Sequence, residues 1–505
     1  MTLKTKLNLM GLLAALALAS SPALAAKGNK NPEPQSQLAE TGKQLEAKYA
    51  AMLATLKAEI AKALPVVAEQ KKAVLHQAQE AFKKAEAAAN STHEPLAKVK
   101  EGEALVAHAK GKWIGGAEKG IAQAEAALKK ATTDAQREAA KKDLAKWEAN
   151  KQDGLKALQE RQAALDKAKA DAAKSGQANQ SAQAALAKAR TDEQTAAKAI
   201  LAEVEPCLSG DKLEAKLVKG TVLAEATPNG LAAFAQQGRE QEALVEKLLA
   251  DTKLMKDMLI AGGASGGKYG RAMEIYAAIQ KASPKASEGV LQRLALATSL
   301  KHAVPVKQTN AEDAKNAPAI VDPVKRYLHY EKAYLAGELD PAFKNFTAWE
   351  YRLVVDCDAP DEILAWGREM LRNYRPDHIS NPNYGWRYSA AVKTEVPYGS
   401  QCVKDDLPSL NTYQNIPKDG GVCGRRAFFG RFVLRSFGIP VWGVTQHKHA
   451  ALSHWTPNGW VINLGAGFQA SWWDKDDAAR SGSDFLLETQ AREHAQDYVK
   501  VLRAQ

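Results

Sequence analysis

Two patterns of apolar residues divide the chain near residue 205. Between residues 33 and 205, alanines and widely spaced leucines recur at alternating spacings of four and three, with Glu, Lys and Gln between them. This spacing is typical of long helices that pack along a narrow seam. We therefore expect a helical coiled-coil stalk over residues 33–205. The clearest part of the seam is the series Ala117, Ile121, Ala124, Leu128, Ala131 and Ala135.

Several breaks interrupt this helical pattern. Pro65 and Pro95 each suit the first turn of a helix, and Gly115–Gly116 and residues 175–179 have the composition of turns. We therefore expect antiparallel pieces that form a hairpin or an elongated spacer. The same seam suits a homo-oligomer formed through the stalk, and a partner-binding helix is the alternative.

Beyond the stalk the chain becomes rich in bulky residues. Residues 33–205 contain 48 alanines and four aromatic residues, whereas 29 of the 33 aromatic residues lie beyond Pro206. Close-packed cores are filled by large side chains. We therefore expect the globular part to begin after Pro206, with a helical region over residues 206–380.

A glycine loop within this helical region is similar to a phosphate-binding motif. Residues 262–268 nearly match the pattern G-x-x-x-x-G-K-[ST], but Tyr269 stands where the motif needs a hydroxyl that binds magnesium. The preceding segment has a helical pattern, and the motif requires a strand there. We therefore expect a flexible connection between two helices and no nucleotide site.

The last part of the chain, residues 381–505, combines one helix with three short strands. Apolar residues spaced by four predict a buried helix over 424–436, and alternation predicts strands at 441–446, 450–455 and 460–464. The pair Asn458–Gly459 is a strong signal for a two-residue hairpin turn, and it would pair His454 with Asn463. The chain as a whole is therefore expected to be α+β.

The N-terminal residues have the pattern of a cleaved secretory signal over residues 1–25. Lys4 and Lys6 precede a short apolar run, Leu9–Ala19, which leads to Ala23–Leu24–Ala25. The run is shorter than the ~18 residues that would span a bilayer. We therefore expect a periplasmic or secreted protein without a transmembrane segment.

Charge adds one exclusion. The formal net charge is +11, and removal of the signal would lower it to +9. Basic and acidic residues are interspersed along the chain, whereas a nucleic-acid-binding protein more often concentrates its basic residues in one stripe. We therefore expect no nucleic-acid partner.

One cysteine stands where a thiol would be reactive. Cys423 follows Gly420–Gly421 and begins the predicted helix, so its sulfur is expected to be accessible. The positive end of the helix dipole and the neighbouring Arg425 and Arg426 favour the thiolate, which is the nucleophilic form. We therefore expect a thiol more acidic than an ordinary cysteine near pKa ~8.5. The histidines that could act as its base are His447, His449 and His454.

These residues resemble the transglutaminase-like superfamily over about residues 380–475. The segments that carry the resemblance are Gly421–Val422–Cys423, Leu434–Arg435–Ser436–Phe437–Gly438–Ile439–Pro440, His449–Ala450 and Gly459–Trp460–Val461. The resemblance implies a papain-like core with a Cys–His–Asp triad and no metal or cofactor.

The resemblance assigns Cys423 as the nucleophile and His449 as the general base. The family's aspartate would fall at Leu464, and Asn463 is the adjacent residue whose amide could orient an imidazole. Strand geometry instead makes His454 the natural neighbour of Asn463. The choice between His449 and His454 therefore stays open at this point.

Two functions follow from the sequence. The first is an exported thiol-dependent amide or acyl hydrolase or transferase that acts on a protein, peptide or peptide-glycan. The second is a non-catalytic envelope binding module on the helical stalk, indicated by Leu464 in place of the family's acid and by Trp472–Trp473 as an exposed aromatic contact. The cysteines that remain for a disulfide are Cys207, Cys357 and Cys402, and pairing of Cys357 with Cys402 is favoured over the others.

Overall fold

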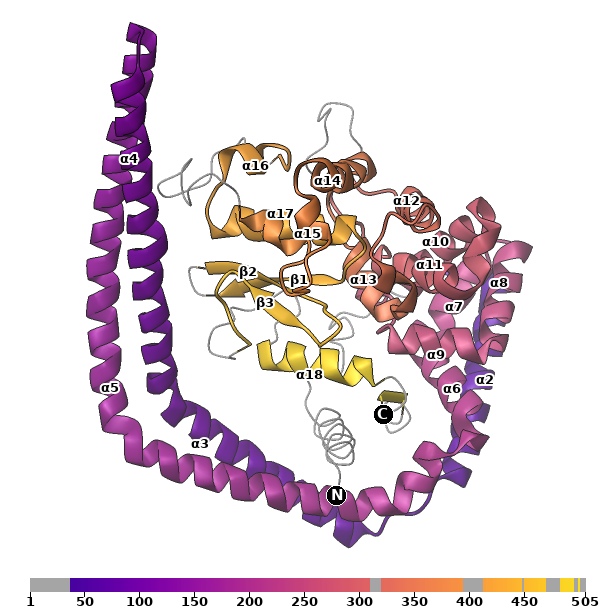
Figure 1. Ribbon diagram of the computed structural model, residues 1–505. Helices are drawn as coiled ribbons and strands as arrows, with labels where there is room; N and C mark the ends of the chain where they lie inside the picture. The colour runs from indigo at the N-terminus through magenta and orange to yellow at the C-terminus, as the bar shows by residue number, and fades with distance from the viewer. Residues whose placement is uncertain are drawn as a thin grey trace.

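The stalk is a helical hairpin that stands beside a helical body and a small sheet (Figure 1). The computed structural model describes residues 37–308, 319–393, 412–446, 449–468, 482–494 and 498–499. The expected signal, Cys402, His447 and Trp472–Trp473 lie outside these residues. Within the described ranges, no helix combines the length and apolar character needed to cross a membrane.

The first arm of the hairpin is a continuous run of helix that bends along its length (Figure 1). It consists of α3 (Glu69–His108), a π-helical segment η1 (Ala109–Ile114) and α4 (Gly115–Lys130), and α5 (Asp134–Ser209) returns beside it. The predicted seam is confirmed at Ala117 and Ala124, which are buried against Trp147. Small residues are required here, because a Cβ on Gly120 would lie 2.2 Å from the Trp147 ring.

The chain reverses at a different place from those that the sequence indicated. The helix continues through Gly115–Gly116 and through residues 175–179, and Pro95 lies inside α3. The reversal occurs after Lys130, where the Thr133 side chain accepts from the Gln136 backbone N–H and caps α5. The predicted turns were wrong because the flanking Ala, Gln and Lys favour helix strongly enough to carry it across isolated glycines.

Helix α2 (Glu40–Ala63) packs on α6 (Glu214–Ala226) and α7 (Pro228–Ala235) in the helical body. Its Tyr49 is fully buried and belongs to the main apolar core. The first segment of the Ala-rich region therefore contributes to the body rather than to the hairpin.

The rest of the helical body is built from short helices between α5 and the sheet. They are η2 (Asp211–Leu213), α8 (Arg239–Ala250), α9 (Thr252–Ile260), η3 (Ser265–Gly267), α10 (Tyr269–Ala282), η4 (Pro284–Ser287), α11 (Gly289–Lys301), α12 (Pro323–Leu335), η5 (Pro341–Asn345), α13 (Ala348–Val355), α14 (Asp361–Tyr374), α15 (Pro376–Ile379) and η6 (Ser389–Val392).

The glycine loop between α9 and α10 is held by a half-buried arginine, Arg352. Arg352 Nη1 donates to the carbonyl oxygens of Ala261 and Gly263, both at 2.6 Å. A phosphate site would need backbone N–H groups at this position, whereas these carbonyls face a cation. The loop is thus a fixed connection, and its carbonyls suit a guanidinium rather than a phosphate.

The C-terminal part confirms the α+β prediction. It contains α16 (Asn415–Asp419), α17 (Cys423–Ser436), β1 (Val441–Gln446), β2 (His449–His454), β3 (Val461–Asn463) and α18 (Gly482–Glu493). The three strands form an antiparallel sheet in the order β1-β2-β3. Figure 1 shows α17 on one face of this sheet and α18 on the other.

The pairing of β2 with β3 differs from the prediction by two residues. Leu452 is paired with Asn463, and His454 with Val461. Thr456 and Gly459 exchange backbone hydrogen bonds of 3.1 and 3.0 Å, so the turn centres one residue earlier than expected, on Pro457 and Asn458. Proline causes this shift of the turn. The fixed φ of Pro457 suits the first central position of a turn, whereas the prediction had placed Pro457 in a paired strand position.

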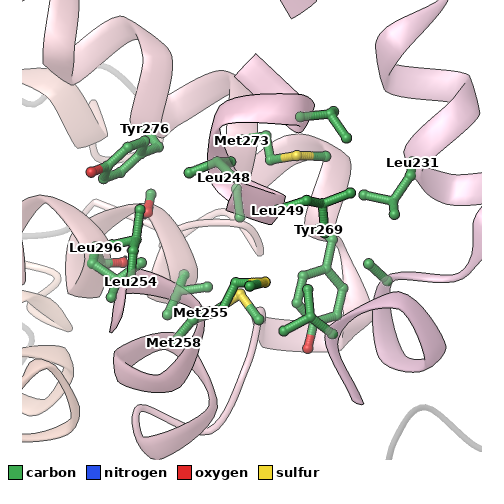
Figure 2. A pocket seen from close by; sticks show the side chains of 16 residues that line it. Leu231, Leu248, Leu249, Leu254, Met255, Met258, Tyr269, Met273, Tyr276 and Leu296 are labelled. Carbon is green, nitrogen blue, oxygen red and sulfur yellow. Dashed lines mark hydrogen bonds between the residues drawn. The ribbon is translucent and has the colours of Figure 1, made fainter. Parts of the chain in front are cut away.

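One apolar cluster joins the helical body to the sheet. It runs from Tyr49 through the middle helices to Phe432 of α17 and to Val441 and Leu452 of the sheet. Within the body it encloses an apolar cavity of about 60 Å³, lined by leucines and by Met255, Met258 and Met273 (Figure 2). The flexible thioethers of methionine suit such an irregular gap.

Replacing Leu249, which lines this cavity and is 5% exposed, with alanine should be strongly destabilising. Leu249→Ala enlarges an existing void, and we expect the free energy of unfolding to fall by about 3–5 kcal/mol. Urea denaturation followed by circular dichroism measures the change. Leu335→Ala on α12, where the side chain is 53% exposed, is the control and should cost less than about 0.5 kcal/mol. Equal losses in the two variants would contradict the packing.

Acid should weaken the body through its buried histidines. Burial is the main cause that lowers the pKa of His302 to about 4 and that of His329 to about 3. In the unfolded chain these two histidines bind protons near pH 6.5, whereas in the folded chain they stay neutral there. The free energy of unfolding should therefore fall as the pH drops from about 6.5 towards 4. We expect His302→Gln, which keeps a donor for the Val355 carbonyl, to reduce the loss between pH 7 and 4.5 by about 2 kcal/mol. His494→Gln, at an exposed position, should leave the pH dependence unchanged.

Candidate functional site

Cys423 is the first residue of α17, and the turn before it requires glycine. Gly420 and Gly421 have φ angles of +87° and +93°, a region that side chains disfavour. Buried Arg426 fixes this turn, because its Nε donates to the Gly421 carbonyl at 2.9 Å and its Nη1 to the Val392 carbonyl at 3.1 Å. The thiol is half-buried. This guanidinium therefore holds the backbone before Cys423.

The direction of α17 on the sheet follows from two contacts. A Cβ on Gly430 would lie 2.5 Å from the Leu452 side chain, so the helix backbone approaches the middle of β2 closely. Near the C-terminal end of the helix, Arg435 Nη2 donates to the Val441 carbonyl at 3.4 Å. Val441 begins β1, so α17 and β1 run in opposite directions.

This geometry brings Cys423 and His449 to the same end of the sheet. Cys423 lies seven residues before Gly430, about 10 Å along the helix axis. His449 lies three residues before Leu452 on β2, about 10 Å along the strand. His454 lies at the other end of β2, where α17 ends. Of the two described histidines, His449 is thus the nearer to the start of α17.

His449 nevertheless projects from the face that α17 does not cover. Side chains alternate along a strand, and Leu452 points to α17. His449 therefore shares a face with Ala451, which packs with Phe485 of α18. The imidazole of His449 and helix α17, which begins with Cys423, therefore lie on opposite faces of the sheet.

Leu464, at the position where the resemblance implies an aspartate, contributes its uncharged backbone carbonyl as the acceptor for His449. His449 Nε2 lies 2.8 Å from the Leu464 carbonyl oxygen. A carbonyl only accepts, so Nε2 carries the proton and Nδ1 is the acceptor nitrogen. Leu464 has a φ of +70°, a strained backbone angle that sets the direction of this carbonyl. An imidazolium at His449 would thus have a backbone dipole in place of a carboxylate.

Asn463 and His454 lie together, but inside the core on the face of the sheet that α17 covers. The Asn463 amide donates to the Gly385 carbonyl at 2.9 Å and to Ser389 Oγ at 2.7 Å, and it lies 3.2 Å from His454 Nε2. His454 is 1% exposed, and burial lowers its pKa. The neutral ring donates from Nδ1 to the Trp455 carbonyl at 2.9 Å. The assignment of Asn463 as a partner of His449 is therefore corrected: its one-residue offset from Leu464 turns it to the other face.

A histidine that the sequence analysis missed lies next to His449. His108 is the last residue of α3, and its ring centroid is 5.9 Å from that of His449 in an edge-on arrangement. Burial, followed by the neighbouring His449, Arg161 and Lys112, lowers the pKa of His108 to about 4. No local pattern in the sequence indicates a functional role for His108. It is a single histidine in an Ala-rich helix, and its contact with His449 is formed only by the fold.

The two histidines belong to a cavity of about 420 Å³ between the hairpin and the end of the sheet. This volume is within the range of small-ligand sites, ~300–1,000 Å³. The hairpin contributes Glu101, Ala104, Leu105, Ala107, His108, Gly111 and Lys112, and the sheet side contributes Gln446, His449, Leu464 and Gly465. We call this cavity the hairpin cleft.

The described part of the chain contains no group of three His, Cys, Asp or Glu side chains that could hold a metal ion. Cys357 is a buried free thiol whose pKa is raised mainly by burial. Its expected partner Cys402 lies outside the described residues.

No family model matches the chain, and neither a curated protein nor a solved structure matches it. The transglutaminase-like resemblance consequently rests only on the sequence segments between Gly421 and Val461 that are named above.

The different surroundings of the two histidines predict different costs of removal. His454→Ala would remove the donor to the Trp455 carbonyl and open a void in the core, and we expect a loss of about 2–3 kcal/mol in the free energy of unfolding. His449 is half-buried, and His449→Ala should cost less than about 1 kcal/mol. Chemical denaturation of both variants measures the difference. A larger cost for His449 than for His454 would contradict the assignment of His454 to the core.

Proposed function

We propose that this chain is an exported binding protein that holds a peptide or peptide-glycan through a transglutaminase-like core, without thiol catalysis. The observation that carries the proposal is the pairing of His449 with the Leu464 carbonyl on the face away from α17. A catalytic imidazole must reach the thiol with its acceptor nitrogen and gain charge during the reaction. The arrangement of His449 favours neither step.

The cleft beside His449 supports a binding role. It combines apolar walls with a few polar groups, which is the usual composition of a small-ligand site. Residues far apart in the chain, His108 of the hairpin and His449 of the sheet, form it together. The export of the protein rests on the signal pattern of residues 1–25.

A thiol-dependent amide or acyl hydrolase or transferase is the second candidate. It is favoured by the position of Cys423 at a helix start and by His449 at the same end of the sheet. In that case His449 would act as the base from Nδ1, with the Leu464 carbonyl orienting the ring.

Alkylation of Cys423 separates the two candidates. The rate of modification by iodoacetamide should be followed from pH 5 to 9 by mass spectrometry of the peptide that contains Cys423. For a binding protein, we expect the midpoint of the pH profile to shift by less than about 0.3 units in His449→Ala, because no ion pair is lost. Cys423→Ala should bind soluble peptidoglycan fragments within twofold of the unmodified protein.

A rise of one pH unit or more in His449→Ala would favour the enzyme, because loss of an imidazolium partner raises the pKa of a thiol. The matched control is His454→Ala, whose histidine lies at the far end of β2 and should leave the profile unchanged. Loss of fragment binding in Cys423→Ala would also count against a purely binding role.

A further inference from the structure

We infer that the hairpin cleft holds an extended oligopeptide of small residues, with its ammonium group near Glu101 and its carboxylate near Lys112. This inference rests on the proposed function and adds to it the location of the site and the class of ligand. The helical hairpin would then be one wall of the binding site, in addition to being a stalk.

The length of the hairpin wall fits a short extended chain. Glu101 and Lys112 are eleven residues apart on the first arm of the hairpin, which corresponds to about 16 Å at 1.5 Å per residue. An extended peptide rises about 3.3 Å per residue, so five residues span the same distance. The charged side chains lie at the two ends of this wall and are opposite in sign.

The middle of the wall has room for a backbone but not for large side chains. Ala104, Ala107 and Gly111 present little or no side chain along the cleft. A Cβ added at Gly111 would meet no atom within 4 Å. Small ligand side chains fit such a trough, whereas aromatic ones would need more space than a cavity of about 420 Å³ offers to five residues.

The sheet side offers polar groups suited to peptide amides. Gln446 is 2% exposed, its Nε2 donates to the Gly467 carbonyl at 3.1 Å, and its Oε1 is buried without a hydrogen-bond partner. A buried acceptor of this kind is costly unless a donor reaches it. A peptide N–H in the cleft would supply that donor. His449 adds its acceptor nitrogen Nδ1 beside it.

The wall is held in place by contacts across the hairpin. Trp113 Nε1 donates to Asn150 Oδ1 at 2.8 Å, and Arg161 Nη1 donates to the Leu105 carbonyl at 2.9 Å. The first contact comes from within the π-helical segment that begins after His108, and the second lies one turn before that segment. Such segments are rare and occur frequently at functional sites. One wall of the hairpin cleft is thus an irregular helix that is held by hydrogen bonds to α5.

Titration calorimetry with penta-alanine tests the inference in the full chain carrying Cys423→Ala, where thiol chemistry cannot contribute. The free peptide has one ammonium and one carboxylate group at the required distance. We expect saturable binding that is weakened at least tenfold by Gly111→Trp, because the indole would fill the trough. Gly176→Trp on α5 is the matched control, because a Cβ added at this second hairpin glycine would also meet no atom within 4 Å. Gly176 lies away from the cleft, so binding should stay within twofold.

Charge recognition is tested with Lys112→Gln. This variant should weaken penta-alanine at least threefold but leave the C-terminally amidated peptide unaffected, because the amide carries no charge for Lys112 to bind. Circular dichroism of every variant establishes that the hairpin is intact. Equal sensitivity of the two peptides to Lys112→Gln would overturn the assigned orientation.

The remaining outcomes separate this inference from the proposed function. Equal binding by Gly111→Trp and Gly176→Trp would overturn the cleft as the site while leaving a peptide-binding protein. Binding of soluble peptidoglycan fragments but not of penta-alanine would overturn the ligand class alone. Absence of binding to both would overturn the proposed function and this inference together.

Discussion

The C-terminal turn of α13 is the point on which the packing of the described structure depends. The last carbonyls of a helix have no partner within the helix, and burying them unpaired is costly. Here the Leu353 carbonyl accepts from Arg435 Nε at 3.0 Å, and the Val355 carbonyl accepts from Arg326 Nη1 at 3.0 Å and lies 3.1 Å from His302 Nε2. Side chains from α17, α12 and the end of α11 thus meet at one helix terminus.

The contacts at the C-terminal end of α13 determine the position of α17, and thus of Cys423, as well as the packing of the core. Arg326 is fully buried and also binds Asp361 at 2.6 Å, so its charge is compensated and the chain between α13 and α14 is held. Arg435 lies on α17 and connects the same terminus to the start of β1. The position of α17 on the sheet, and with it the end at which Cys423 lies, follows from these contacts. A buried guanidinium that loses its partners is strongly destabilising, so this arrangement has little freedom to shift.

Local patterns in the sequence predicted the helix at Cys423 and all three strands, because each is specified by neighbouring residues. The pairing of β2 with β3 could not be predicted from Asn458–Gly459 alone, since the fixed φ of Pro457 moved the turn by one residue. An even shift preserves the face of a side chain, so His454 and Asn463 still meet. The contact of His108 with His449 depends on packing between distant segments, which no local pattern records.

The Ala-rich composition of the hairpin has two consequences that follow from the same physics. Small side chains let α4 and α5 approach closely, as Gly120 against Trp147 requires. Beside His449 the hairpin faces the end of the sheet instead of a second helix. Small side chains cannot fill the space between the hairpin and the sheet there. Ala104 and Gly111 therefore line a cavity rather than a seam. The cleft therefore lies where the Ala-rich hairpin passes the end of the sheet, and the sheet contributes His449 to it.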